Sequence, residues 1–133
     1  LMNRNLKFYY CILLACLSSY IYSDEIANYS NIKIKADVVT FDELANELLL
    51  RKNLKISFGG FNIFGDTALL NYENKKLTID GSPASINSKE NAISGAAKRF
   101  IIYPNLSLEM LGDANLIEHN NSMYAEQITY QIK

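Results

Sequence analysis

Residues that carry enzymatic or metal chemistry are sparse in this sequence of 133 residues. The one histidine, His119, lies in a segment of turn-forming residues, and the two cysteines, Cys11 and Cys16, lie near the start of the chain. A transition-metal site usually needs several His or Cys ligands. The sequence has no Gly-x-Ser-x-Gly elbow, and no Gly-Lys-Ser/Thr follows Gly59-Gly60 to form a phosphate loop. We therefore predict that the protein is not an enzyme and that it has no metal and no cofactor.

Acidic residues recur at similar places along the chain. They are Asp37, Asp66, Asp80, Asp113 and Glu126. Carboxylates at such positions are typical of strand starts and turns, so we assign them a structural role. The formal net charge of -1 offers no excess of Lys and Arg to neutralise phosphates, which argues against a nucleic-acid partner.

The first 23 residues differ in composition from the rest. Arg4 and Lys7 precede an apolar run over residues 8–17, and small and polar residues follow up to Ser23. This order of a positive, an apolar and a polar segment is typical of a secretory signal peptide. We predict a signal peptide over 1–23 and a single domain over 24–133, placed in the periplasm.

Two alternatives for the leader stay open. Residues 8–22 could be retained as a membrane anchor, although the apolar run is shorter than the roughly 20 residues of a membrane span. Leu13-Leu14-Ala15-Cys16 also has some likeness to a lipid-attachment motif, with Cys16 as the modified residue. Cleavage after Ser23 leaves a domain without cysteine, which must fold in an oxidising compartment without disulfides.

Alternation of apolar and polar residues dominates the rest of the chain. It occurs at 32–36, 54–58, 77–80, 106–110 and 128–132. Turn-forming clusters separate these runs at 59–60, 72–75, 81–83, 87–91, 104–105, 112–113 and 120–122. A period of two is the pattern of strands with one buried face, and closely spaced turns indicate hairpins. The prediction is an all-β domain of short antiparallel strands in two facing sheets.

Residues 41–50 have helical propensity, with Thr40 as a possible cap. The position of this segment in the chain matches that of strands elsewhere. We predict a turn that leads into a strand at 48–50, with a single helical turn as the alternative.

A short motif recurs through the chain. An apolar residue, any residue, a small residue and usually an acid begin at Ile34, Ile63, Ile93 and Met123, which are 29, 30 and 30 positions apart. Such a repeat predicts stacked units, each covering the apolar face of its neighbour. The unit that begins at Met123 stops half-finished at Lys133.

An incomplete unit leaves an open strand edge, and open edges pair with other chains. We predict end-to-end association in which residues 32–39 of one copy or partner meet residues 123–132 of another. The predicted edge residues are Ile32, Ile34, Met123, Ile128, Tyr130 and Ile132.

One set of apolar residues is predicted to point inward from the strands. It comprises Ile34, Ile56, Phe58, Ile63, Leu70, Ile79, Ile86, Phe100, Ile102, Leu108, Met110, Leu116 and Ile128. Two interpretations are open: an ordinary core, or the lining of an apolar groove between sheets that do not fully close. The pattern by itself favours the core, the usual location of such residues.

The residues from Ile32 to Lys133 resemble the OstA-like family of lipopolysaccharide-transport proteins, also called the LptA family. The resemblance is carried by residues 34–37, 53–56, 61–66, 80–84, 93–97 and 111–116, and most closely by Met123-Tyr124-Ala125-Glu126-Gln127-Ile128-Thr129-Tyr130. The order and spacing of these segments agree over nearly all of the domain.

The resemblance implies a β-jelly roll that is open along one side and holds the acyl chains of lipopolysaccharide, so that the inward residues become a lipid-binding set. It also implies head-to-tail self-association into a bridge from the inner to the outer membrane. The implied partners are an LptC-like inner-membrane protein and an LptD-like outer-membrane protein. An alternative within the same export system is a membrane-anchored, LptC-like assembly partner.

Overall fold

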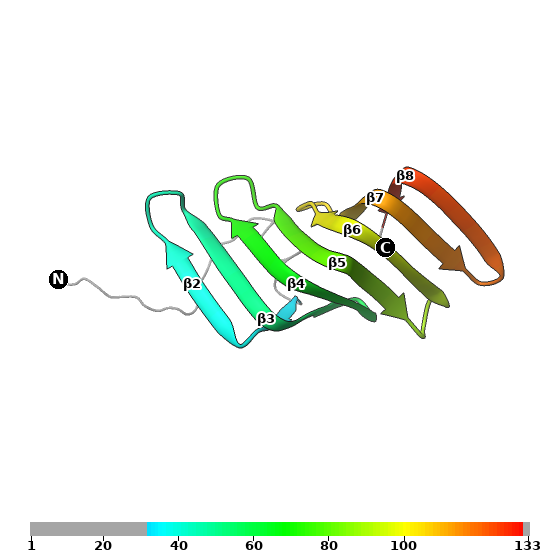
Figure 1. Ribbon diagram of the computed structural model, residues 1–133, viewed down its shortest axis with the longest axis horizontal. Coiled ribbons are helices and arrows are strands. Elements are labelled where there is room, and N and C mark those ends of the chain that lie inside the picture. Colours follow the sequence, from blue (N-terminus) through cyan, green and yellow to red (C-terminus); the bar gives the residue numbers. More distant parts are fainter. Residues whose placement is uncertain (1–31, 132–133) are drawn as a thin grey trace. The chain divides into compact units, whose positions relative to one another are not determined.

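The computed structural model describes residues 32–131, which form strands and turns without a helix. The strands are β1 (Lys33–Lys35), β2 (Val38–Asp42), β3 (Glu47–Phe58), β4 (Phe61–Asn71), β5 (Leu77–Ser88), β6 (Ile93–Ile102), β7 (Ser107–Glu118) and β8 (Asn121–Gln131). They form one antiparallel sheet in which β3 to β8 follow chain order and both β1 and β2 pair with β3 (Figure 1). The prediction of an open, antiparallel all-β domain is confirmed.

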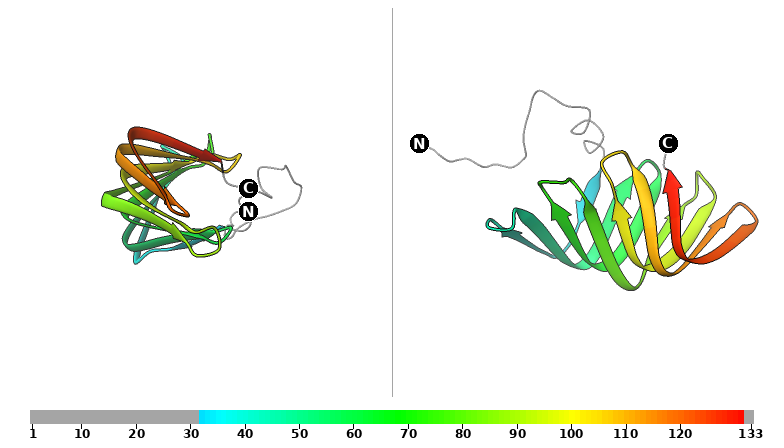
Figure 2. Two further views of the ribbon diagram at one scale, coloured as in Figure 1. Left: turned by 90° about the vertical axis from the view of Figure 1, so that its right-hand side faces the viewer. Right: turned by 90° about the horizontal axis from the view of Figure 1, so that it is seen from above.

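The sheet bends along one line that crosses the middle of every long strand. The pairing register shifts between Arg51 and Leu54 in β3, between Asp80 and Ala84 in β5, and between Leu111 and Ala114 in β7. Extra residues of this kind bend a strand while the pairing continues on both sides. Figure 2 shows the strands bending together, so that two halves of the sheet face each other.

We call these halves arm A and arm B. Arm A consists of residues 33–35, 54–58, 61–65, 84–88, 93–97, 114–118 and 121–125, and arm B of residues 38–42, 47–51, 67–71, 77–80, 99–102, 107–111 and 127–131. Each repeat of about 30 residues is therefore a pair of long bent strands. The two facing layers are two parts of one sheet, and the strands are longer than the sequence pattern suggested.

Two of the predicted turns are bulges inside strands. Gly81-Ser82-Pro83 lies within β5 and Gly112-Asp113 within β7, at the bend line. Glycine suits the second position because Gly112 has a φ of 84°, a left-handed conformation that disfavours other side chains. The sequence correctly indicated a change of chain direction at these two positions. The change is a bend within one strand and not a turn between two strands.

The segment at 41–50 folds as predicted. Strand β2 ends at Asp42, residues 43–46 form a turn, and β3 begins at Glu47. The Asp42 carboxylate accepts a hydrogen bond from the Ala45 backbone N–H at 3.2 Å. Asn46 takes a left-handed φ of 55°, which ends the turn and excludes a continuing helix.

Candidate functional site

The inner face of arm A carries a row of apolar residues that crosses the whole sheet. Residues opposite each other in antiparallel strands point to the same face, so the pairing register defines the row. It consists of Ile34, Ile56, Ile63, Ile86, Gly95, Leu116 and Met123. Ile56 and Ile63 are fully buried, and Ile86 and Leu116 are nearly so. The repeat thus places one position of β1 and of each long strand from β3 to β8 on a single inward line.

Arm B contributes two such rows to the same interior. Nearer the bend lie Val39, Leu50, Ala68, Ile79, Phe100, Met110 and Ile128, and nearer the tips lie Phe41, Leu48, Leu70, Leu77, Ile102, Leu108 and Tyr130. Their central members have no measurable exposure, Phe100 and Ile102 among them. The facing rows enclose a continuous apolar interior that runs along the sheet from β1 to β8.

The predicted inward residues all point into this interior, and most of them are buried. Ten are buried: Ile56, Phe58, Ile63, Ile79, Ile86, Phe100, Ile102, Leu108, Met110 and Leu116. The other three, Ile34, Leu70 and Ile128, are partly buried and pack against the same cluster. The two arms are closed on each other in this structure, so these residues form its hydrophobic core.

Several inner-face residues were missed at the sequence level. Leu54 and Leu77 each lie two positions before a predicted residue, and Ile93 lies two positions before Gly95. Leu54 and Leu77 begin two of the alternating runs, so the period-two pattern itself signals both residues. Phe61 follows the Gly59-Gly60 turn directly, where the pattern is interrupted. Small residues gave no signal of their own. These are Ala68, Ala84, Ala97 and Ala114, all buried close to the bend line or beside it.

The arms interlock at Gly95. A Cβ at this position in arm A would lie 3.2 Å from Cε of Met110, which belongs to arm B, and 2.5 Å from the backbone oxygen of Asn115. Because Gly95 has no side chain, the end of the Met110 side chain can pack against its backbone. This explains why glycine stands in a row whose other members are large and apolar.

The apolar interior is uncovered at the two ends of the sheet. Val39 and Phe41 on β2 are 57% and 51% exposed, and Met123 on β8 is 42% exposed, although all three lie in inward rows. Within residues 32–131, β8 pairs with β7 alone, and β1 and β2 pair with β3 alone. Both end strands thus combine a free backbone edge with exposed apolar side chains.

The predicted edge residues belong to these end strands or lie next to them. Met123 is exposed, whereas Ile32, Ile34, Ile128 and Tyr130 are partly buried against the core. Ile132 lies outside the described residues, and so does the predicted signal peptide at 1–23.

Charge is distributed unevenly between the ends. Lys33, Lys35 and Lys55 are exposed on the outer side of arm A at the β1 end, and no acid lies within β1 or residues 54–58. At the other end, β7 and β8 contain four acids and no Lys or Arg. These acids are Glu109, Asp113, Glu118 and Glu126. The β1 end of arm A therefore carries positive charge, whereas the negative charge at the β8 end lies mostly at the bend line and on arm B.

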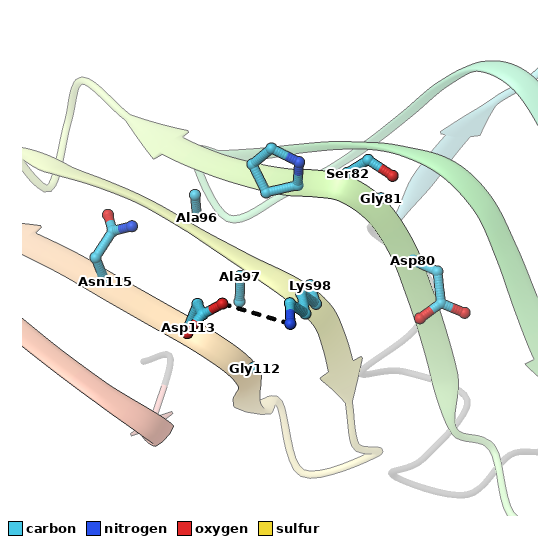
Figure 3. Close-up of a pocket in the computed structure, with 10 residues that line it drawn as sticks. Asp80, Gly81, Ser82, Ala96, Ala97, Lys98, Gly112, Asp113 and Asn115 are labelled. Atoms are coloured by element: carbon cyan, nitrogen blue, oxygen red, sulfur yellow. Dashed lines mark ion pairs between the residues drawn. The ribbon is translucent and has the colours of Figure 1, made fainter.

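The bend line is braced by polar contacts. Arg99 binds the carboxylate of Asp80 with distances of 2.6 and 3.2 Å, which raises the pKa of Arg99 through the hydrogen bond and the charge of Asp80. Lys98 and Asp113 form a second, more exposed ion pair at 3.4 Å (Figure 3). Asp80, Lys98 and Asp113 line a hollow of about 590 Å³ at the bend. Two of the recurring acids, Asp80 and Asp113, thus take part in polar contacts at the bend.

Two tyrosines have perturbed ionisation. Tyr103 donates a hydrogen bond of 2.7 Å to Glu109, and this bond raises the pKa of its hydroxyl. Burial raises the pKa of Tyr130, and the charge of Glu118 adds to the shift. Both groups remain neutral at physiological pH. Residues 32–131 hold no group of three or more His, Cys, Asp or Glu that could bind a metal ion.

The chain matches one family model over most of its length. The model describes the LptA/LptD N-terminal domain lipopolysaccharide transport protein, and the match covers residues 33–133. No curated protein matches the sequence. Residues 32–131 contain no helix with the length and hydropathy of a membrane span.

A similar solved structure is that of LptH from Pseudomonas aeruginosa, described as the LptA-homologous periplasmic component of the conserved lipopolysaccharide transport device. The TM-score is 0.66 at 20% sequence identity, and the alignment covers 75% of each chain. At this identity the similarity shows a shared fold.

Proposed function

The chain belongs to the LptA/LptD N-terminal domain family of lipopolysaccharide transport proteins, and on this premise we propose that it binds lipopolysaccharide and carries it between the membranes. The observation that carries the proposal is the apolar interior, which inward rows on both arms extend along the sheet from its β1 and β2 end to β8. An ordinary core would be capped at the ends. Here the interior reaches both end strands with Val39, Phe41 and Met123 exposed.

Acyl chains would lie between the arms and contact the predicted lipid-binding residues. The arms must separate for this, because residues such as Phe100 and Leu108 are buried. Separation without a ligand would expose both inner faces to water. Lipid chains cover the same faces as the arms part, and burial of each methylene group contributes about 0.8 kcal/mol. Lipid binding therefore requires no charged side chain in the interior. Among the described residues the one charged side chain on the inner face is the partly buried Glu118, near the tip of arm A.

The same geometry supports a bridge of modules joined head to tail. Within the described residues the outer edges of β8 and of β1 and β2 pair with no further strand, so the two edges can satisfy each other's backbone groups, as in β-augmentation. Joining would also cover Val39, Phe41 and Met123 and continue the apolar interior from one module to the next. A contact between two different surfaces does not close on itself, so it builds a chain between end partners.

The location and the partners follow from this role. We propose that residues 1–23 direct the domain of 24–133 to the periplasm. An LptC-like inner-membrane protein and an LptD-like outer-membrane protein would then occupy the two ends of the bridge. Sequencing the N-terminus of the mature protein tests the leader, and a retained segment at 8–22 would favour the membrane-anchored alternative.

Mass spectrometry of the protein purified without detergent from a Gram-negative envelope tests the lipid proposal. We expect co-purified lipopolysaccharide or lipid A in a ratio near one per chain or per few chains. Protein that carries no lipid, and that also fails to take up added lipopolysaccharide, would contradict the proposed function.

A further inference from the structure

An aromatic cluster connects the tips of the two arms. Phe58 and Phe61 flank the Gly59-Gly60 turn of arm A and stack with their ring centroids 6.0 Å apart. Tyr130, near the end of β8 in arm B, meets Phe61 edge to face at 6.2 Å. Strands β4 and β8 are separated by three strands in the sheet. The contact therefore forms across the space between the arms and not along the sheet.

The cluster covers the interior where a hairpin tip would otherwise leave it open. Phe58 and Phe61 adjoin two exposed glycines, yet they are only 5% and 3% exposed. Tyr130 is partly buried and packs against the same core. Edge-to-face pairs of this kind are favourable beyond the area that they bury, so the contact holds the tips together.

The strand that carries Tyr130 is held on one side. Within the described residues β8 pairs with β7 alone, and residues 121–127 are all exposed. Phe61, by contrast, lies in β4, which pairs on both sides with β3 and β5. An outward movement of the arm B end of β8 breaks fewer contacts than any movement of β4. The Tyr130 side of the contact is therefore the side that can move.

We propose that the contact of Tyr130 with Phe61, which Phe58 backs by stacking on Phe61, is a latch that closes the apolar interior, and that a lipid acyl chain enters between the arms by displacing Tyr130. The inference rests on the proposed function, and it adds the place and the residues that control lipid uptake. Tyr130 suits this task because its ring packs on Phe61 while its hydroxyl can face water when the strand moves.

The first test compares uptake rates of fluorescently labelled lipopolysaccharide by stopped-flow mixing. Tyr130→Ala removes the ring and should increase the rate of uptake about 2- to 12-fold, the range expected for one aromatic pair. Tyr130→Phe keeps the ring and should retain the wild-type rate. Tyr124→Ala is the matched control, since Tyr124 lies on the same strand and is 82% exposed on the outer side. Equal rates for Tyr130→Ala and Tyr124→Ala would overturn the latch.

The second test locks the latch in place. Phe61→Cys and Tyr130→Cys are combined in the full chain with Cys11→Ser and Cys16→Ser, and the pair is joined by a short bis-maleimide. The locked protein should lose at least tenfold in uptake rate relative to the same variant capped with a mono-maleimide. Circular dichroism checks that both forms remain folded.

The outcomes separate the two claims. Uptake that is equally fast in the locked and capped forms overturns the latch and leaves the proposed function intact. Lack of uptake in the wild type and the capped form overturns the proposed function itself. Slow uptake in the locked form, with uptake in the capped form at or above the wild-type rate, supports both.

Discussion

Replacement of Phe100 by alanine separates an ordinary core from an interior that accepts lipid. Phe100 lies at the centre of an arm B row, between Ile79 and Met110, and it has no measurable exposure. Its removal leaves a cavity in the interior without disturbing a charge or a backbone conformation. The outward neighbour Ile101, which is partly exposed, provides a matched control in the same strand.

The expected cost is large for a domain of this size. Truncation of a buried phenylalanine to alanine typically costs about 3–5 kcal/mol, and the total stability of a small domain is about 5–15 kcal/mol. For a domain of about 100 residues each kcal/mol lowers Tm by roughly 4–8 °C. Phe100→Ala should therefore lower Tm by at least about 12 °C. Ile101→Ala should cost about 1 kcal/mol or less, since its side chain is not enclosed.

Thermal unfolding followed by circular dichroism, with and without lipid A, provides the readout. Acyl chains that occupy the interior fill the cavity, so lipid A should raise the Tm of Phe100→Ala by more than that of Ile101→Ala or the wild type. A loss below about 1 kcal/mol for Phe100→Ala would show that the arms are not packed as described. A Tm that does not respond to lipid A in any of the three proteins would refute the assignment of the interior as a lipid site.

Three further predictions follow from the inner face and the ends of the sheet. Ile102→Asp places a carboxylate in the apolar interior, so it should lower the free energy of unfolding by several kcal/mol and weaken lipopolysaccharide binding. Ile101→Asp, on the outer side, should change the free energy of unfolding by about 1 kcal/mol or less. Equal effects of the two variants in denaturant titrations and binding assays would count against the assigned faces. Gly95→Ala should destabilise the domain by about 1–3 kcal/mol, because its Cβ would lie 2.5 Å from the backbone oxygen of Asn115 in the same arm and 3.2 Å from Cε of Met110 in arm B. A neutral effect on the urea midpoint would show that the strands and arms are not packed this closely at Gly95. The double variant Lys33→Glu and Lys35→Glu should weaken end-to-end association, and high salt should weaken the wild type similarly; sedimentation profiles that depend on neither charge nor salt would exclude the electrostatic contribution.

The period-two pattern was sufficient to predict most of the strands and the side of each that is buried. It placed Ile56, Ile63 and Phe100 on the inner face because alternation fixes the face independently of the sheet's curvature. The resemblance drawn from residues 32–133 is confirmed by the family match, which covers nearly the same range. The repeat of about 30 residues corresponds to one pair of long strands.

The bend was not predictable from the same pattern. Lys52 takes a left-handed φ of 69°, which the sequence does not signal because lysine rarely adopts this conformation. The adjoining Asn53, with a φ of 52°, is of a residue type that tolerates it. The pattern also assigns residues to faces within a strand but not to contacts between arms. The approach of Phe61 to Tyr130 depends on how the two arms lie across each other, so it is visible in the structure alone.

Site-specific photo-crosslinking in cells tests the central claim most directly. Probes at Leu70 and Ile128, which are inward and partly buried, are compared with probes at their outward neighbours Leu69 and Thr129. If the interior carries lipopolysaccharide, the two inward probes form adducts with it and the two outward probes do not. Adducts of equal yield at all four positions, or at the outward positions alone, would contradict the account.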